Sequence, residues 1–369
     1  MKIIVYSYDD TGNPWCGGGG ALRIETVHSL LAENGHDITF ITGNYPGASK
    51  KWKGPFKKVF VGLKWSYLLS RVSYFILANF HSLVSKADIF LAAFSAYAPV
   101  FIFLYKKNVI VEFYHLLGKR CLEKYHIFGI FPFLSEKIML SSARTIITMA
   151  PGTKQDVLDH YPDKNIHALP CGFDNLQLQL EPLNEKYILT FGRLDIYMKG
   201  LDRLISTMSD ILINLPDYKL IIAGRGSDDD IKQLYKLSEQ SPIHDKIQII
   251  LKPDYSAKLD LFRKCTYVAI FSRFEGWCIV AIEAAAAGKA ILGVDVEGLR
   301  DSVANDFNGI LVKDFDRDQL VVYGKKLLTD DAFRSRYEKN ARIHASRFTW
   351  SNIAEMQLSV YKEHLRELT

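Results

Sequence analysis

The feature that most constrains this chain is an alternation of short apolar runs with helical segments, which occurs in two successive sets. The first set contains KIIVYSY, HDITFIT, ADIFLAAF, NVIVEFYH and RTIITMA. After the loose polar stretch at residues 171–186, the second set contains YILTFG, YKLIIAG, KIQIIL, YVAIFS and KAILGVD. Strands that read as continuous apolar runs are typical of parallel sheets covered by helices on both faces. The sequence therefore predicts an α/β protein with two doubly wound domains and a cleft between them.

The length of the chain favours the same two domains. Its 369 residues are about twice what one hydrophobic core usually organises. We expect a first domain over residues 1–170, a second over 171–347, and a terminal helix in 348–369 that crosses back to the first. The composition, with 48% hydrophobic and 24% charged residues, is ordinary for a globular protein. A net charge of +5 without a dense basic stripe argues against a nucleic-acid partner.

The cysteines and apolar segments indicate a reducing, cytoplasmic location. The five cysteines are scattered singly without CxxC spacing, which supports neither a zinc site nor a disulfide framework. The N-terminal MKIIVYSYDD reaches acidic residues too soon for a signal peptide. The longest apolar run, Ile89 to Tyr105, is slightly short for a bilayer span and contains a proline. We interpret it as a buried strand followed by a buried helix, with a single membrane span as the alternative.

One stretch is both basic and aromatic, and it contains no acidic residue between Asp37 and Asp88. Its basic residues are Lys50, Lys51, Lys53, Lys57, Lys58, Lys64 and Arg71, and its aromatic residues include Trp52, Phe56, Phe60, Trp65, Tyr67, Tyr74 and Phe75. This combination suits an anionic membrane surface, with the region from Lys50 to Arg71 as the candidate contact. The alternative is a solvated basic loop beside a helix whose aromatic side chains belong to the core.

The stretch FEGWCIVAIEAAAAG, residues 274–288, is the strongest candidate for chemistry. It follows the strand YVAIFS and reads as a loop and then a helix of small residues. At the carboxyl end of a parallel strand, the unpaired amides around Cys278 would favour an anion or sugar hydroxyls. Two acids, Glu275 and Glu283, converge on this helix mouth, and carboxylates accept hydrogen bonds from hydroxyl groups. The arrangement predicts a sugar on one side and a ribose on the other.

The spacing of these two acids resembles the E-x7-E motif of the retaining glycosyltransferases of family 4. Other pieces resemble the family in the same order, namely GGGG before LLAENGHDITFIT, ALPCGFD, FGRLDIYMKGLDRLI, IIAGRGSDD and FTWSNIAE. The resemblance implies the GT-B fold, in which two Rossmann-like domains face each other across a cleft. It also implies a hexosyltransferase that moves a sugar with retention from a nucleotide-sugar donor, with UDP-sugars favoured over GDP-sugars.

The resemblance further implies an acceptor bound by the N-terminal domain and no metal or other cofactor. Together with the basic aromatic stretch, it suggests a glycan or lipid-linked acceptor in the synthesis of cell-envelope polysaccharide, lipopolysaccharide or glycolipid. The enzyme would then be cytoplasmic and peripheral on the inner face of the membrane. The segment SDDD, Ser227 to Asp230, reads as a helix cap with acids in the first turn rather than as a metal site.

The resemblance also assigns roles to individual residues. Glu283 would bind the donor ribose, Glu275 the transferred sugar, and Arg193 with Lys199 the donor diphosphate. His115 matches a position where many members place a histidine beside the sugar, and a core or capping histidine is the alternative. The catalytic residues implied are Glu275, His115, Arg193 and Lys199. The donor-binding residues implied are Gly18, Gly19, Gly192, Arg193, Lys199, Glu275, Gly276, Trp277, Cys278, Ile279 and Glu283.

Two departures from the family pattern leave the sugar and the base of the donor undetermined. Trp277 and Cys278 stand where phenylalanine and glycine are usual, and Lys252 stands where a glycine often lies beside the base. The competing functions are another GT-B enzyme, such as a nucleotide-sugar epimerase, and a non-enzymatic scaffold with this fold. A dinucleotide dehydrogenase is disfavoured because neither glycine cluster forms the compact G-x-G-x-x-G turn.

Overall fold

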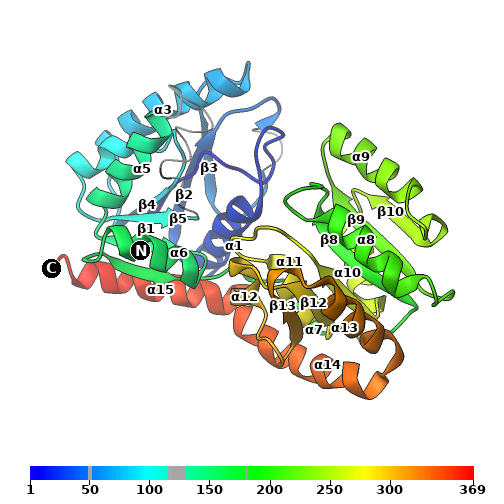
Figure 1. Cartoon of the computed structure of the whole chain (residues 1–369). Helices are drawn as coiled ribbons and strands as arrows, with labels where there is room; N and C mark the ends of the chain where they lie inside the picture. The colour runs from blue at the N-terminus through cyan, green and yellow to red at the C-terminus, as the bar shows by residue number, and fades with distance from the viewer. Residues whose placement is uncertain (49–51, 115, 117, 119–129, 180) are drawn as a thin grey trace. The chain divides into compact units, whose positions relative to one another are not determined.

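The computed structural model describes residues 1–48, 52–114, 116, 118, 130–179 and 181–369. Its internal contacts divide the chain into two compact units. Figure 1 colours the chain by residue number, from blue at the N-terminus to red at the C-terminus. Unit 1 comprises Met1–Cys171 together with Trp350–Thr369, and unit 2 comprises Gly172–Thr349. The chain therefore returns to unit 1 for its last helix.

Unit 1 is built on a parallel sheet with the strand order β3-β2-β1-β4-β5-β6-β7. The strands are β1 (Lys2–Tyr6), β2 (Asp37–Gly43), β3 (Lys57–Val61), β4 (Ile89–Ala93), β5 (Val109–Phe113), β6 (Thr145–Thr148) and β7 (Asn165–Ala168). Along β1, Ile3 and Val5 point into one core while Ile4 and Tyr6 point into another. Because both faces are buried, the strand shows no alternation of polar and apolar residues.

Helices cover both faces of this sheet. On the side of Ile3 and Val5 lie α1 (Gly19–Glu33) and the terminal α15 (Trp350–Arg366). On the other side lie α3 (Tyr67–Val84), the short 3-10 helix η1 (Val100–Leu104) and α5 (Ile130–Ser142). The helix α6 (Pro151–His160) connects β6 to β7. The doubly wound arrangement expected from the sequence is thus present in unit 1.

A buried polar network fixes α15 to the rest of unit 1. Arg23 of α1 donates hydrogen bonds to Glu112 of β5 (2.6 Å) and to Gln357 of α15 (2.8 Å). The side chains of Arg23 and Glu112 have no exposed surface. Nearby, His28 of α1 accepts a hydrogen bond at Nε2 from the hydroxyl of Tyr361, because its Nδ1 faces the Ile24 carbonyl at 2.7 Å and is the donor. Three elements that are distant in sequence therefore share one polar network.

Unit 2 contains a parallel sheet with the order β10-β9-β8-β11-β12-β13, which repeats the order of the first six strands of unit 1's sheet. The strands are β8 (Tyr187–Arg193), β9 (Lys219–Arg225), β10 (Ile247–Leu251), β11 (Tyr267–Ile270), β12 (Ala290–Val294) and β13 (Gly309–Val312). The helices are α7 (Leu176–Gln179), α8 (Leu201–Leu212), α9 (Asp228–Glu239), α10 (Tyr255–Lys264), α11 (Ile279–Ala286), α12 (Glu297–Ser302), α13 (Arg317–Thr329) and α14 (Asp331–Ala345), with 3-10 turns η3 (His244–Lys246), η4 (Lys313–Phe315) and η5 (Ser346–Phe348). The strand order reverses between β8 and β11, and ligands of such sheets bind at that point.

Each apolar run predicted as a strand is a strand, but the prediction missed β3, β7 and β13. The apolar run from Ile89 to Tyr105 forms β4 and then η1, whose Phe101 and Leu104 are exposed, so the expected buried helix was wrong. The cap proposed for α9 is confirmed, because the side chain of Ser227 accepts a hydrogen bond from the Asp230 amide at 3.1 Å. Within the described part of the chain, no helix has the length and apolar content needed to cross a membrane.

The basic aromatic stretch separates into an inner and an outer part. The Lys58 ammonium lies 2.8 Å from Asp10 Oδ2 and 3.0 Å from Glu25 Oε1, and its side chain is only 1% exposed. The Trp52 ring covers the same ammonium at 3.7 Å from the ring centroid. Lys58 therefore serves the interior of unit 1, and the half-buried Trp52 packs over it. Lys50 and Lys51 lie outside the described residues.

Candidate active site

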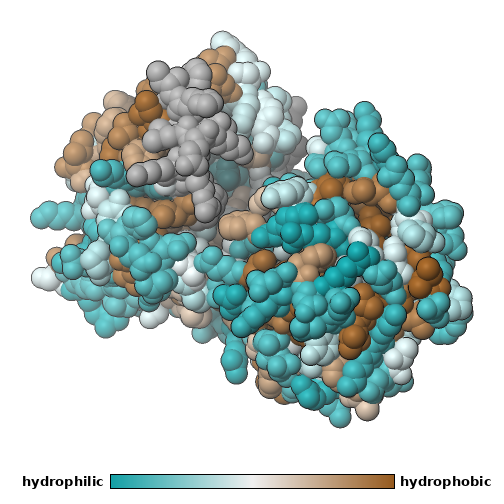
Figure 2. Space-filling model, viewed as in Figure 1, coloured by the Kyte–Doolittle hydropathy of each residue, from teal (hydrophilic) through white to brown (hydrophobic). Residues whose placement is uncertain are grey.

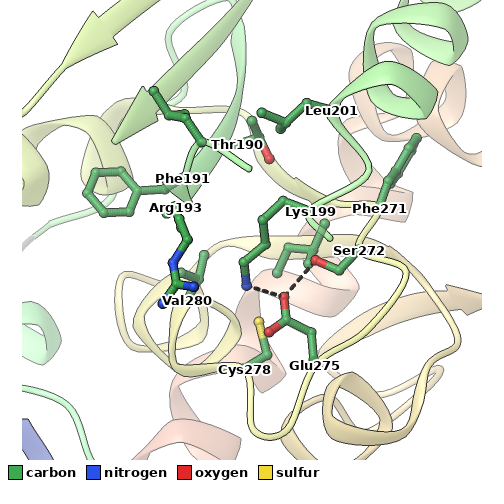
Figure 3. Close-up of a pocket in the computed structure, with 13 residues that line it drawn as sticks. Thr190, Phe191, Arg193, Lys199, Leu201, Phe271, Ser272, Glu275, Cys278 and Val280 are labelled. Carbon is green, nitrogen blue, oxygen red and sulfur yellow. Dashed lines mark hydrogen bonds and ion pairs between the residues drawn. The ribbon is translucent and has the colours of Figure 1, made fainter. Parts of the chain in front are cut away.

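In unit 2, a narrow pocket lies where the strand order reverses, at the carboxyl ends of β8 and β11. The β8 end contributes Thr190, Phe191, Gly192, Arg193 and Leu194, the next loop and helix Lys199 and Leu201, and the β11–α11 segment Ile270, Phe271, Ser272, Glu275, Cys278 and Val280. Figure 3 shows the side chains of Lys199, Ser272 and Glu275 meeting in this pocket, with Cys278 beside them. Of the residues predicted for the site, this pocket is lined by Gly192, Arg193, Lys199, Glu275 and Cys278.

Glu275 is the centre of this pocket. The Lys199 ammonium and the Ser272 hydroxyl each donate a hydrogen bond of 2.6 Å to the same oxygen, Glu275 Oε1 (Figure 3). Glu275 is buried, whereas the side chain of Lys199 is 29% exposed. The ion pair thus has one sealed member and one member that a ligand can reach.

Two glycines allow the backbone to bring this pair together. Gly200, directly after Lys199, has φ +63°, and a Cβ there would lie 2.1 Å from the Phe271 carbonyl oxygen. Gly298 of α12 donates its amide to the Glu275 carbonyl at 3.1 Å, and a Cβ on it would lie 2.4 Å from that oxygen. Any side chain at either position would push the lysine loop or the glutamate loop away.

A second ion pair fastens the same two loops. Arg273 donates two hydrogen bonds to the carboxylate of Asp202, at 2.8 and 2.7 Å, and a third of 2.9 Å to the Tyr197 carbonyl. This bidentate contact holds the pKa of Asp202 below its usual value. Arg273 therefore links the segment that carries Lys199 to the segment that carries Glu275.

Arg193 and Cys278 complete the pocket. Arg193, at the end of β8, is exposed and directs its guanidinium toward the same side as the Lys199 ammonium (Figure 3). Cys278 is buried beside the Glu275 carboxylate, and burial is the main cause that raises the pKa of its thiol. The thiol is thus neutral and is no nucleophile at physiological pH. Its amide donates to the Gly298 carbonyl at 3.3 Å, so this group is not one of the unpaired amides expected there.

Glu283 lies inside α11 and is paired in a similar way. The Lys258 ammonium of α10 forms a salt bridge with Glu283 Oε1. Burial raises the pKa of the Glu283 carboxyl, and the Lys258 charge acts in the opposite direction. Lys258 is 22% exposed and also lies over the Phe191 ring at 5.5 Å from its centroid. Each acid of the motif is therefore held by a lysine that solvent can reach.

The other residues predicted for the site lie in unit 2 outside this pocket, in unit 1, or outside the described residues. The Trp277 ring packs against Phe348 with ring centroids 5.5 Å apart, and neither it nor Ile279 lines this pocket. Gly18 caps the N-terminus of α1 in unit 1, and Gly19 is its first residue. A Cβ built on Gly18 would contact nothing within 4 Å. His115 lies outside the described residues.

The sequence reasoning missed two residues that contact the motif acids, Ser272 and Lys258. Ser272 could have been found, because it ends the strand YVAIFS three residues before Glu275. Lys258 gave no such signal, since it is one of many lysines on amphipathic helices and lies 25 residues before its partner. Among the described residues, no group of three or more histidines, cysteines or carboxylates could hold a metal ion.

The two doubly wound units place the chain in the class of α/β proteins whose ligands bind where the strand order reverses. Comparison with solved structures narrows this class to the GT-B fold. The chain resembles sucrose-phosphate synthase from Thermosynechococcus elongatus with a TM-score of 0.80 at 18% identity, covering 98% of each chain. It resembles Anabaena HepE in complex with UDP-glucose with a TM-score of 0.76 at 14% identity, covering 98% of this chain and 100% of that one.

Sequence models of known families identify the chain more closely. The model of Glycosyltransferase Family 4 matches residues 17–175, and the model of Glycosyl transferases group 1 matches residues 174–344. The chain thus belongs to family 4 of the glycosyltransferases, as its motifs predicted.

Curated relatives match over shorter stretches. An uncharacterized glycosyltransferase of Methanocaldococcus jannaschii is 33% identical over 236 residues, which is 59% of each chain. The phosphatidyl-myo-inositol mannosyltransferase of Mycolicibacterium smegmatis is 26% identical over 201 residues, which is 53% of this chain and 51% of that one. The matched part of this chain thus spans about half to three fifths of these relatives' length.

Proposed function

We propose that the chain transfers a hexosyl group from a nucleotide-sugar donor to an acceptor with retention of configuration. The observation that carries this proposal is the hydrogen bond from Lys199 to Glu275, in which a buried carboxylate is held by a partly exposed ammonium. A carboxylate in a bare phosphate site would repel the ligand. Beside a sugar and a diphosphate, each member of the pair has a partner of its own.

In the proposed reaction, the donor diphosphate occupies the exposed side of Lys199 and Arg193. The bond between the sugar C1 and the diphosphate oxygen breaks, and the acceptor hydroxyl oxygen bonds to C1 on the same face. The acceptor proton passes to the departing diphosphate oxygen. The two fixed cations stabilise the negative charge that grows on this leaving group. Glu275, still held by Ser272, accepts hydrogen bonds from the sugar hydroxyls.

The other acid is proposed to bind the ribose of the donor. A carboxylate can accept hydrogen bonds from two neighbouring hydroxyls, and the salt bridge with Lys258 favours the ionised form of Glu283. We favour a UDP-sugar over a GDP-sugar, in line with the complexes of Anabaena HepE with UDP-glucose and with UDP. We also propose that Arg193 and Lys199 supply the positive charge at the diphosphate without a metal ion, so that a chelator leaves the rate unchanged.

The proposed acceptor is a glycan or a lipid-linked sugar bound by unit 1, in the synthesis of a cell-envelope polysaccharide, lipopolysaccharide or glycolipid. A relative named for mannosyl transfer to phosphatidyl-myo-inositol supports a lipid-linked acceptor. The enzyme would work at the cytoplasmic face of a membrane.

The proposal is tested by incubating the protein with UDP- and GDP-hexoses, with and without a lipid extract of envelope membranes. We expect nucleotide release that depends on the extract, a glycosylated lipid with the donor's anomeric configuration by NMR, and no effect of EDTA. Glu275→Gln should abolish transfer, whereas Glu239→Gln, at an exposed position of α9, should not. Conversion of the donor into another nucleotide sugar without an acceptor product would indicate an epimerase, and no turnover with any donor would favour a scaffold.

A further inference from the structure

The outer side of α3, η1 and α5 in unit 1 is unusually apolar. Figure 2 shows hydrophobic residues gathered over α3 and α5. We define the apolar face by its exposed residues, which are Leu63, Trp65, Leu68, Leu69, Val72, Ile76, Leu77, Phe80, Leu83, Val84, Phe101, Leu104, Ile130, Phe131, Leu134 and Ile138. Exposed apolar patches of this extent mark an interaction surface.

The helix α3 is inverted relative to an ordinary surface helix. Its buried residues are Ser70, Tyr74, Ala78, Asn79 and Ser82, which are mostly small or polar. Its exposed side carries leucine, isoleucine, valine and phenylalanine, at positions such as Ile76 and Phe80. A helix that packs on a sheet and faces water has the opposite distribution. The outer side of α3 is therefore suited to an apolar medium.

The three elements form one continuous surface rather than three separate patches. The Phe75 ring contacts the Phe101 ring of η1 with centroids 5.8 Å apart and the Phe131 ring of α5 with centroids 5.4 Å apart. These edge-on contacts fix the helices beside each other. The exposed residues of all three elements thus face the same medium.

The charges around the apolar face indicate which kind of partner it contacts. Lys64, Lys86, Lys107 and Lys137 are exposed on or next to its elements. The sequence has no acid from Asp37 to Asp88 or from Asp88 to Glu112, and the acid of α5, Glu136, is buried. A symmetric dimer through this face would bring two copies of the same set of lysines into one interface. Anionic lipid headgroups would instead pair them, while Trp65 suits the interfacial depth.

We infer that the apolar face lies in the plane of an anionic bilayer, with α3 and α5 at the boundary between headgroups and acyl chains. No described helix can span a membrane, so the contact is one-sided. This contact keeps Lys64 and Trp65 of the Lys50–Arg71 region predicted from the sequence but not Lys58, whose side chain is internal. The inference deepens the membrane location in the proposed function by naming the surface that makes the contact, and it holds whether or not the chain transfers a sugar.

The test is flotation of the full chain with vesicles of phosphatidylcholine alone or of equal parts phosphatidylcholine and phosphatidylglycerol. We expect binding to the anionic vesicles, with a blue shift of tryptophan emission that Trp65→Phe removes. The triple variant Ile76→Ser, Phe80→Ser, Leu104→Ser should lose binding. The matched control is Val322→Ser with Ile343→Ser, two exposed apolar residues on α13 and α14 of unit 2, which should bind like the wild type.

The charge is tested by Lys64→Ser with Lys137→Ser, which should weaken binding roughly fivefold per lysine removed. All variants should keep the wild-type melting temperature and nucleotide binding, which separates this test from that of the proposed function. Vesicle binding by the triple variant at the wild-type level would overturn the inference. The inference would also be overturned if the wild type bound no vesicle and formed a dimer in solution that the triple variant did not form. Unchanged binding of the lysine variant would overturn the choice of an anionic lipid.

Discussion

The two units have the same order of their first six strands but use lysine–carboxylate pairs differently. In unit 1, Lys58 joins Asp10 and Glu25 with 1% of its side chain exposed. In unit 2, Lys199 and Lys258 hold Glu275 and Glu283 with 29% and 22% exposed. A sealed pair stabilises a loop, because neither charge can gain another partner. A half-open pair can exchange its lysine contact for a ligand, which makes it a candidate site.

The two units also differ in how their exposed apolar residues are distributed. Unit 1 gathers most of its exposed large apolar residues on the apolar face, whereas in unit 2 they are more scattered, as at Ile213, Val322 and Ile343. Scattered apolar residues are normal on any protein, but a continuous face is not. Both proposals rest on this contrast, with a docking surface proposed on unit 1 and a small-ligand site proposed in unit 2. Each prediction below tests one part of this contrast.

The largest expected effect is on the stability of unit 1. Lys58→Ala leaves two buried carboxylates without a cation and should lower the free energy of unfolding by about 3–5 kcal/mol. The same substitution at the half-open Lys199 should change stability far less. Guanidinium unfolding of both variants measures the difference. Equal losses would remove the distinction between sealed and half-open pairs.

The next effect is on catalysis in unit 2. Lys199→Ala should slow transfer by about 10²–10³-fold, or roughly 2.7–4 kcal/mol of barrier, because it removes a cation at the leaving group. Lys186→Ala, which breaks an exposed pair with Asp217 in the same unit, should leave the rate unchanged. Single-turnover rates on the lipid extract provide the measurement. A rate for Lys199→Ala equal to that of the control would contradict the role of Lys199.

A change of pH should alter the stability of unit 1 by a free energy similar to the barrier change expected for Lys199→Ala. Burial lowers the pKa of His28 to about 4 from its ordinary 6.5. The unfolded chain therefore binds this proton first, so stability is full above pH 6.5 and is lost as pH falls to about 4, by about 3 kcal/mol in total. The measurement is unfolding as a function of pH, and His28→Gln should show a shallower loss over this range. Equal pH profiles would show that the buried His28 does not carry the effect.

The smallest effect concerns nucleotide binding. Because burial raises the pKa of Glu283 and Lys258 opposes this, Lys258→Met should raise that pKa further. Glu283 accepts hydrogen bonds from ribose hydroxyls best when it is ionised, so the affinity for UDP should fall as the pH decreases. In Lys258→Met this fall should begin at a higher pH than in the wild type. Near pH 7 the loss should be tenfold or less, which is about 1.4 kcal/mol. Calorimetric titration from acidic to neutral pH checks this, and Glu283→Gln, which has no proton to gain, should show no such midpoint.

The sequence was sufficient to predict the fold and the position of Glu275 at the end of a strand. Buried parallel strands leave a clear apolar signal, whereas β3, with its two lysines, and the four-residue β7 and β13 leave little. The strand-end position of Glu275 followed from the strand–loop–helix pattern. The contact of Lys258 with Glu283 did not, because it depends on how α10 packs beside α11.

Side-chain direction was the other information that the sequence lacked. Trp277 lies in the motif loop, yet its ring packs against Phe348 rather than lining the pocket. Likewise, the aromatic residues near Lys58 and those of α3 read alike in the sequence. Only the packing of unit 1 shows that Phe56 and Tyr74 are core residues while Phe80 is exposed.

The central claim is that the half-open pairs of unit 2 receive the nucleotide of the donor. It is tested most directly by thermal unfolding with UDP, GDP and ADP, on the wild type, Glu283→Ala and the control Glu239→Gln. A nucleotide at a hundred times its Kd adds about 2.7 kcal/mol of stability. We expect UDP to raise the Tm of the wild type and the control but not that of Glu283→Ala. An equal rise in Glu283→Ala, or no rise with any nucleotide, would contradict the account.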